Sequence, residues 1–140
     1  MDKNKANRTY DGIVFDSKLE MSFYRDWVLP KLNSGELSKC GLQVKHELQE
    51  KFTHEDNVVR AIVYVADFLI THANGSQTVI DIKGQPDSVA KLKRKLFWFR
   101  YPGVDYRWMG FSKIDGGWVD YEVIQAGRKS RKKANRESSK

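Results

Sequence analysis

Two strand-forming segments on either side of Asn74-Gly75 constrain the fold of this chain more than any other feature. Residues 58–71 and 78–83 are rich in β-branched and apolar side chains, and both are long enough to be strands. Asn-Gly between two such runs is a strong signal for a β-hairpin. The sequence therefore predicts an antiparallel hairpin, whose apolar first strand belongs in the interior of a sheet.

The length of the hairpin loop decides which side chains of the two strands face each other. A two-residue loop would set Asp67 opposite Ile82, whereas a three-residue loop over 73–75 would set Asp67 opposite Asp81. We expect the three-residue loop, because such loops end in a left-handed residue and Gly75 suits that position.

The other elements follow from apolar periodicity and turn residues. Helices are expected over residues 17–32, closed by Pro30 and the Asn33-Ser34-Gly35 turn, and over residues 88–100. Further strands are expected near 44–52, 106–111 and 118–124. The order predicts an α/β or α+β domain in which two helices flank a mixed sheet of about five strands.

Charge separates a nearly neutral body from a basic end. The 140 residues carry a net charge of +7, but residues 128–140 hold seven Lys/Arg and one Glu. We expect one domain over 1–127 with a loose basic start over 1–9, followed by a disordered basic tail. A basic tail favours nucleic acid as a partner, although a merely solubilising tail would look the same.

Composition excludes several classes of protein. No apolar run approaches the ~20 residues that a membrane span needs, and the first ten residues lack a signal core. Cys40 is the only cysteine, which excludes an intramolecular disulfide. These features predict a cytoplasmic protein without a membrane partner.

Charged residues interrupt both strands of the hairpin. Asp67 is the only charge between residues 61 and 70, and Asp81 and Lys83 are two apart and so share a face. An unpaired buried carboxylate costs several kcal/mol or more, so each acid needs a cation. The cation is either a metal ion or Lys83 itself, in a purely structural salt bridge.

A third acid lies on the first predicted helix. Counting 100° per residue, Glu20 shares a face with Phe23, Tyr24 and Trp27, and we expect that face to pack on the sheet. Ser17 and Glu20 also form a capping-box pattern, which would explain Glu20 without any metal. Oxygen ligands without His or Cys suit Mg²⁺ or Mn²⁺.

These residues resemble the motif of the PD-(D/E)xK, or restriction-endonuclease-like, nuclease superfamily. Asp67 lies in YVADFLI, and Asp81 and Lys83 lie in VIDIKG, after a helix that carries Glu20. Ala66 stands where the motif has proline. The segments YDGIVFDSKLE, KHELQEKF and KLKRKLFWFRYPGV extend the resemblance over about residues 10–111, to small phage and prophage nuclease-like proteins, some of which are thought to be Holliday-junction resolvases.

The resemblance implies a restriction-endonuclease-like core and a Mg²⁺-dependent endonuclease of a phage or prophage in a bacterial host. It implies that Asp67, Asp81 and the backbone carbonyl of Ile82 ligate the metal, with Glu20 as a further ligand. Lys83 would orient or deprotonate the attacking water, or stabilise charge on the phosphate. Cleavage would leave 5′-phosphate and 3′-hydroxyl ends, and a junction resolvase would act as a homodimer.

Basic side chains provide candidate DNA contacts. Helix 88–100 contains no acid after Asp87, which precedes it, and its inward face is predicted to be Val89, Leu92, Leu96 and Phe99. The predicted DNA-binding residues are Lys91, Arg94 and Lys95 of this helix and Arg128, Lys129, Arg131, Lys132 and Lys133 of the tail. Two alternatives remain open: another nicking, flap or end-processing nuclease, or a non-catalytic DNA-binding protein with a structural Asp/Lys network.

Overall fold

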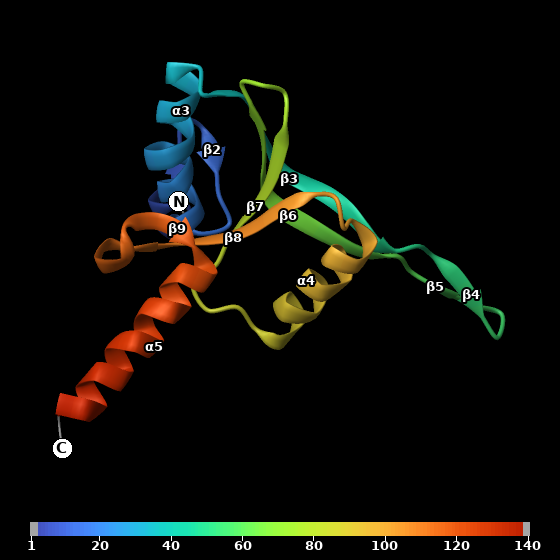
Figure 1. Cartoon of the computed structure of the whole chain (residues 1–140). Helices are drawn as coiled ribbons and strands as arrows, with labels where there is room; N and C mark the ends of the chain where they lie inside the picture. The colour runs from blue at the N-terminus through green and yellow to red at the C-terminus, as the bar shows by residue number, and fades with distance from the viewer. Residues whose placement is uncertain (1–2, 139–140) are drawn as a thin grey trace. The chain divides into compact units, whose positions relative to one another are not determined.

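A five-stranded mixed sheet organises the chain in the computed structural model, which describes residues 3–138 (Figure 1). The strands occur in the order β3-β6-β7-β8-β9 across the sheet. Their bounds are Leu37–Gln49 for β3, Ile62–His72 for β6, Gln77–Ile82 for β7, Asp105–Ser112 for β8 and Gly117–Asp120 for β9. The predicted α/β class with a mixed sheet of about five strands is confirmed.

Strands β7 and β8 are joined by a crossover that contains helix α4 (Ser88–Arg100). Thr78 donates to Asp105 near the start of both strands, and the Lys83 amide donates to the Met109 carbonyl near their ends. Partner numbers rise together along the two strands, so they run parallel, as a helical crossover requires. The carboxylate of Asp87 caps α4 by accepting from the Ala90 amide at 2.8 Å, because the first amides of a helix lack partners within it.

The predicted three-residue hairpin loop is confirmed. The His72 amide donates to the Ser76 carbonyl, and the Gly75 amide donates back to His72. Gly75 has a φ of 88°, in the left-handed region that only glycine enters without strain. The antiparallel register of β6 and β7 runs from this loop as far as Phe68 opposite Ile80.

The first long helix is continuous but changes its winding. It consists of α2 (Lys18–Phe23), the π-helical segment η1 (Tyr24–Val28) and α3 (Leu29–Ser34). Pro30 therefore does not end it, contrary to our expectation. The Leu29 amide donates to Tyr24, five residues back, and this wider turn accommodates a proline that has no amide of its own.

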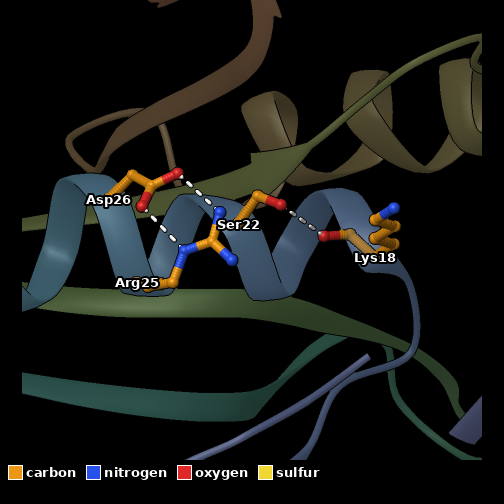
Figure 2. Close-up of polar contacts among 4 residues, drawn as sticks. All are labelled: Lys18, Ser22, Arg25 and Asp26. Carbon is orange, nitrogen blue, oxygen red and sulfur yellow. Dashed lines mark hydrogen bonds and ion pairs between the residues drawn. The ribbon is translucent and has the colours of Figure 1, made fainter. Parts of the chain in front are cut away.

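The solvent-facing side of that helix carries its own polar pairs, drawn in Figure 2. Two guanidinium nitrogens of Arg25 lie 2.8 and 3.0 Å from the carboxylate oxygens of Asp26. The Ser22 hydroxyl donates to the Lys18 carbonyl one turn earlier. Charged side chains are satisfied here in the exposed positions, which leaves the opposite side for apolar burial.

The start of the chain is ordered where it is described. Residues 3–7 form the short helix α1 (Lys3–Asn7), so the prediction of a loose segment is wrong there; Met1 and Asp2 lie outside the described residues. Strands β1 (Thr9–Tyr10) and β2 (Ile13–Val14) form a hairpin. The turn between them has left-handed residues at both central positions, which matches the twist of two-residue hairpins.

A second small hairpin lies between β3 and β6. It consists of β4 (Phe52–His54) and β5 (Asn57–Val59), and Figure 1 shows it beyond the ends of β3 and β6. Glu55 and Asp56 both have positive φ values, as a two-residue loop of this hand requires. The predicted strand from residue 58 is therefore interrupted before β6 begins.

The C-terminal segment differs most from our expectation. A 3₁₀ turn, η2 (Lys113–Asp115), leads into β9, and helix α5 (Tyr121–Ser138) follows at once. The predicted strand over 118–124 therefore ends at Asp120. The predicted disordered tail is helical over residues 128–138, and residues 139 and 140 lie outside the described part. Lys, Arg, Ala and Glu favour helix, and the buried Ile124 anchors its first turns.

The described residues form two compact units, each built from several segments of the chain. The first holds the residues up to Lys31, Asp81–Gly84 and the residues from Arg107; the second holds Leu32–Ile80 and Gln85–Tyr106. The predicted single domain over 1–127 stays a prediction. Among residues 3–138, no helix combines the length and apolarity that a membrane crossing demands.

The core of the second unit corrects the predicted inward face of α4. Phe97 is fully buried there with Tyr64, Ala66, Val79 and Leu48. The residues predicted to face inward are instead largely exposed: Val89 and Leu92 at 57% each and Phe99 at 88%, with Leu96 partly buried. Apolar residues occur on most sides of this helix, so periodicity could not choose a face. Phe97 decides the buried face, because its ring packs edge-to-face or tilted against three tyrosines and His46.

Candidate active site

Asp81 and Lys83 form a tight pair at the end of β7. The Lys83 ammonium lies 2.6 Å from a carboxylate oxygen of Asp81, whose side chain is 4% exposed. The ammonium is also 5.3 Å from the ring centroid of Trp108, whose π-electrons favour a cation. The two residues therefore share a face, as the alternation of the strand predicts. The ion-pair partner of Lys83 is therefore Asp81.

The backbone beneath this pair is held closely by β8. The Lys83 amide donates to the Met109 carbonyl at 2.8 Å. A Cβ atom on the next residue, Gly110, would lie 2.9 Å from the Lys83 carbonyl and 2.9 Å from Ile124, closer than real Cβ contacts. Glycine at 110 therefore allows β8 to approach the backbone of Lys83. The close approach fixes the backbone position from which the Lys83 side chain extends.

Glu20 is buried on α2, as its helical face predicted. Ser17 caps the helix by accepting from the Glu20 amide at 3.1 Å, which is half of the predicted capping box. Burial, then the charge of Asp16 and then that of Asp81, raise the pKa of Glu20 from 4.5 to about 7. Hydrogen bonds with Ser17 and the Asp16 backbone oppose that rise. The second carboxylate oxygen, Oε2, is buried without a hydrogen-bond partner.

This surplus of negative charge fits a cation. Glu20 and Asp81 interact strongly enough to shift a pKa, and an orphaned buried carboxylate oxygen lacks the donor that such atoms normally have. The donors are all oxygens, which suits Mg²⁺ or Mn²⁺. Within residues 3–138, no three Asp, Glu, His or Cys side chains already converge as a ready-made metal group. Asp81 is instead engaged by Lys83, so the predicted ligand set stays a prediction.

Asp67 and Gln43 lie in the second unit. Asp67 lies in the middle of β6 and is buried, with 8% of its surface exposed. Gln43 lies inside β3 and is exposed. Its φ of 52° is left-handed, which is uncommon for a residue other than glycine within a strand. The side chain of Ile82, whose carbonyl is a predicted ligand, is buried.

The predicted DNA-binding residues of α5 do not all have the same surroundings. Arg131 donates to both carboxylate oxygens of Asp115, at 2.8 and 3.2 Å. This pair holds the pKa of the Asp115 carboxyl below its ordinary value, with a second hydrogen bond from Ser112. The other basic side chains of the helix are exposed: Arg128, Lys129, Lys132, Lys133 and Arg136. Of these, Lys129, Lys133 and Arg136 lie on the side opposite Arg131, whereas the charge of Arg128 also lowers the pKa of Asp115. Arg131 therefore holds α5 against the η2 turn through Asp115, and its charge is already paired.

Reasoning from the sequence missed two features of the site. Asp16, just before the N-cap residue Ser17, acts on Glu20 more strongly than Asp81 does. The position of Asp16 next to the capping box could have indicated that its charge would act on Glu20. The basic helical face of α5 was missed because its polar, Ser-rich composition resembles a disordered tail.

Comparison with known proteins identifies a family that matches most of the chain. The family described as "Protein of unknown function (DUF1064)" matches residues 1–114, which include all four predicted catalytic residues. No curated protein and no solved structure matches the chain.

Proposed function

This chain belongs to the DUF1064 family, and from its own residues we propose that it is a Mg²⁺-dependent DNA endonuclease. The observation that carries the proposal is the environment of Glu20. A buried carboxylate with a pKa of about 7, an oxygen without a partner and a second buried acid acting on it make an unfavourable arrangement until a cation arrives. Proteins retain such arrangements chiefly at functional sites.

We assign Glu20, Asp81 and Asp67 to hold the metal, together with the Ile82 carbonyl. Asp67 is included because the motif that the sequence resembles implies it as a ligand, and its side chain is buried. When bound, Mg²⁺ supplies Lewis-acid activation of water and phosphate. Lys83 begins paired with Asp81 and is available to position the attacking water or to stabilise charge on the phosphate. The products would carry 5′-phosphate and 3′-hydroxyl ends.

The substrate we favour is branched DNA, cut by a homodimer in phage or prophage recombination inside a bacterial host. Basic residues without acidic neighbours on α4 and the exposed basic face of α5 support binding to phosphates without base readout. The competing function is a non-catalytic DNA-binding protein, and the 2.6 Å pair of Asp81 and Lys83 favours it as a self-contained structural network.

A cleavage panel with Mg²⁺ tests the proposal. Four-way junctions, flaps, single strands and linear duplex would be compared between the wild type and Asp81→Asn, with Asp120→Asn as a control because Asp120 pairs with Arg107 on the surface. We expect cleavage that Asp81→Asn abolishes, and Mg²⁺ stabilisation of the wild type that the variant largely loses. Absence of both cleavage and Mg²⁺ stabilisation in the wild type would select the non-catalytic function.

Neutralising the exposed face of α5 should reduce the salt dependence of DNA binding. In Lys129→Gln/Lys132→Gln/Lys133→Gln, Arg131 still fastens the helix through Asp115. If each lysine contacts a phosphate, the slope of log K against log salt falls by about 2 to 3. The matched control removes three exposed lysines elsewhere: Lys18, Lys51 and Lys113. Equal slopes in the two triple variants would remove α5 from the DNA interface.

A further inference from the structure

The outer face of α4 combines two exposed aromatic rings with uncompensated positive charge. Phe99 is 88% exposed and Trp98 is 48% exposed, although both belong to residue types that normally gain stability by burial. Counting 100° per residue places Lys91 and Lys95 on the strip between these two rings, and both lysines are exposed.

The residues of this outer face do not stabilise the folded chain through contacts within α4. Lys91 and Lys95 are four residues apart on the helix, where like charges repel, and no acid follows Asp87 in α4 to offset them. The helix is already anchored from its other side, where Phe97 is fully buried and Lys93 donates to the Val63 carbonyl at 3.2 Å. The partner of the outer face must therefore come from outside the helix, and its charge must be negative.

The aromatic rings narrow the class of anion. The guanidinium of Arg94 lies 4.7 Å from the ring centroid of Trp98. It therefore covers one face of the indole and places a positive charge beside the ring. A base stacks on the remaining face of such a ring or on Phe99, irrespective of its identity. In duplex DNA the bases are covered by their neighbours, so only unpaired nucleotides offer both phosphates and free base faces.

We propose that the outer face of α4 binds unpaired nucleotides, with Trp98 and Phe99 stacking on bases and Lys91 and Lys95 contacting phosphates. The inference deepens the proposed function, on which it rests for DNA as the nucleic acid. It assigns single-stranded segments, such as those at flaps and open junctions, as the part of the substrate that this helix recognises.

Binding without Mg²⁺, in EDTA, tests this separately from cleavage. Anisotropy would measure the Kd of an oligothymidine and of a blunt duplex for wild type, Trp98→Leu/Phe99→Leu and Trp98→Tyr/Phe99→Tyr. Phe52→Leu is the control, because Phe52 is another exposed aromatic of the same unit. We expect the leucine variant to weaken oligothymidine binding about tenfold or more, with duplex binding within about twofold of wild type and the tyrosine variant close to wild type.

Several outcomes would overturn the inference. Equal weakening on both DNAs, or no weakening on either, would reduce α4 to a phosphate contact. If the wild type is a dimer and the leucine variant is a monomer that binds oligothymidine as before, the outer face of α4 is an interface between two copies of the chain. Binding of anionic vesicles that depends on the two rings, without such dependence for oligothymidine, would assign it to a lipid surface. Ring-dependent oligothymidine binding in a protein that cuts no DNA would uphold the inference and refute the nuclease function.

Discussion

Lys83→Met should lower the rate of DNA cleavage by about 10² to 10⁴-fold while DNA binding changes little. Methionine keeps most of the unbranched stem that lies beside Trp108, but it removes the ammonium 2.6 Å from Asp81. The measurement is single-turnover cleavage of the best substrate, with Kd determined in EDTA. Lys113→Met is the matched control, since Lys113 is an exposed lysine of the same unit.

The same variant separates catalysis from structure through its stability. Removing the ammonium leaves the buried Asp81 carboxylate without this partner, which costs about 3 to 5 kcal/mol when a buried pair is broken. If the site binds metal, Mg²⁺ restores more stability to Lys83→Met than to wild type, because the cation then takes the place of the ammonium. Full cleavage by Lys83→Met would remove Lys83 from the mechanism, and a loss of stability that Mg²⁺ does not restore would favour the structural network.

Glu20→Gln should make the metal-free protein more stable above pH 7 and leave it unchanged near pH 4. The folded-state pKa of Glu20 is about 7, above its ordinary 4.5, so folding favours the protonated acid. The stabilising contribution is complete below pH 4.5 and is lost as the pH rises through 7. The shift corresponds to about 2 kcal/mol once solvent screening is allowed for. Chemical unfolding between pH 4 and pH 9 in EDTA measures it.

Metal provides the complementary test of Glu20. Mg²⁺ should stabilise wild type more at pH 8 than at pH 5, because the ionised carboxylate is the form that binds a cation. Glu20→Gln should flatten that difference, and Glu50→Gln, at an exposed position outside the strands, should leave it intact. Parallel stability profiles for wild type and Glu20→Gln would show that the carboxylate is satisfied by its helix cap and is not a ligand.

Local patterns in the sequence were enough for the central hairpin. Asn74-Gly75 and the glycine at the left-handed position predict the three-residue loop, and the loop length by itself determines the parity of every pair between β6 and β7. The inward position of Glu20 and the shared face of Asp81 and Lys83 follow from the periods of a helix and a strand. These properties depend only on neighbours along the chain.

Other features depend on residues distant in sequence, and only the tertiary structure decided them. Helix α4 has apolar residues on most sides, and the cluster of Tyr64, Tyr101 and Tyr106 selects Phe97 for burial while Phe99 is left exposed. Residues 121–138 are helical because Ile124 is buried and Arg131 pairs with Asp115 in the turn before β9. Polar composition predicted disorder there, since it carries no information about either contact.

The electrostatic properties of the site also divide into those that the sequence determined and those that the tertiary structure decided. The sequence by itself determined which acids and which lysine lie on inward faces, because the side-chain period of each element is set by its backbone geometry. It did not determine that Asp16 would act on Glu20, that Lys83 would pair with Asp81, or that one carboxylate oxygen of Glu20 would be buried without a donor. Those depend on burial and on distances of a few ångströms, which arise only when the helix, the strands and Gly110 are packed together.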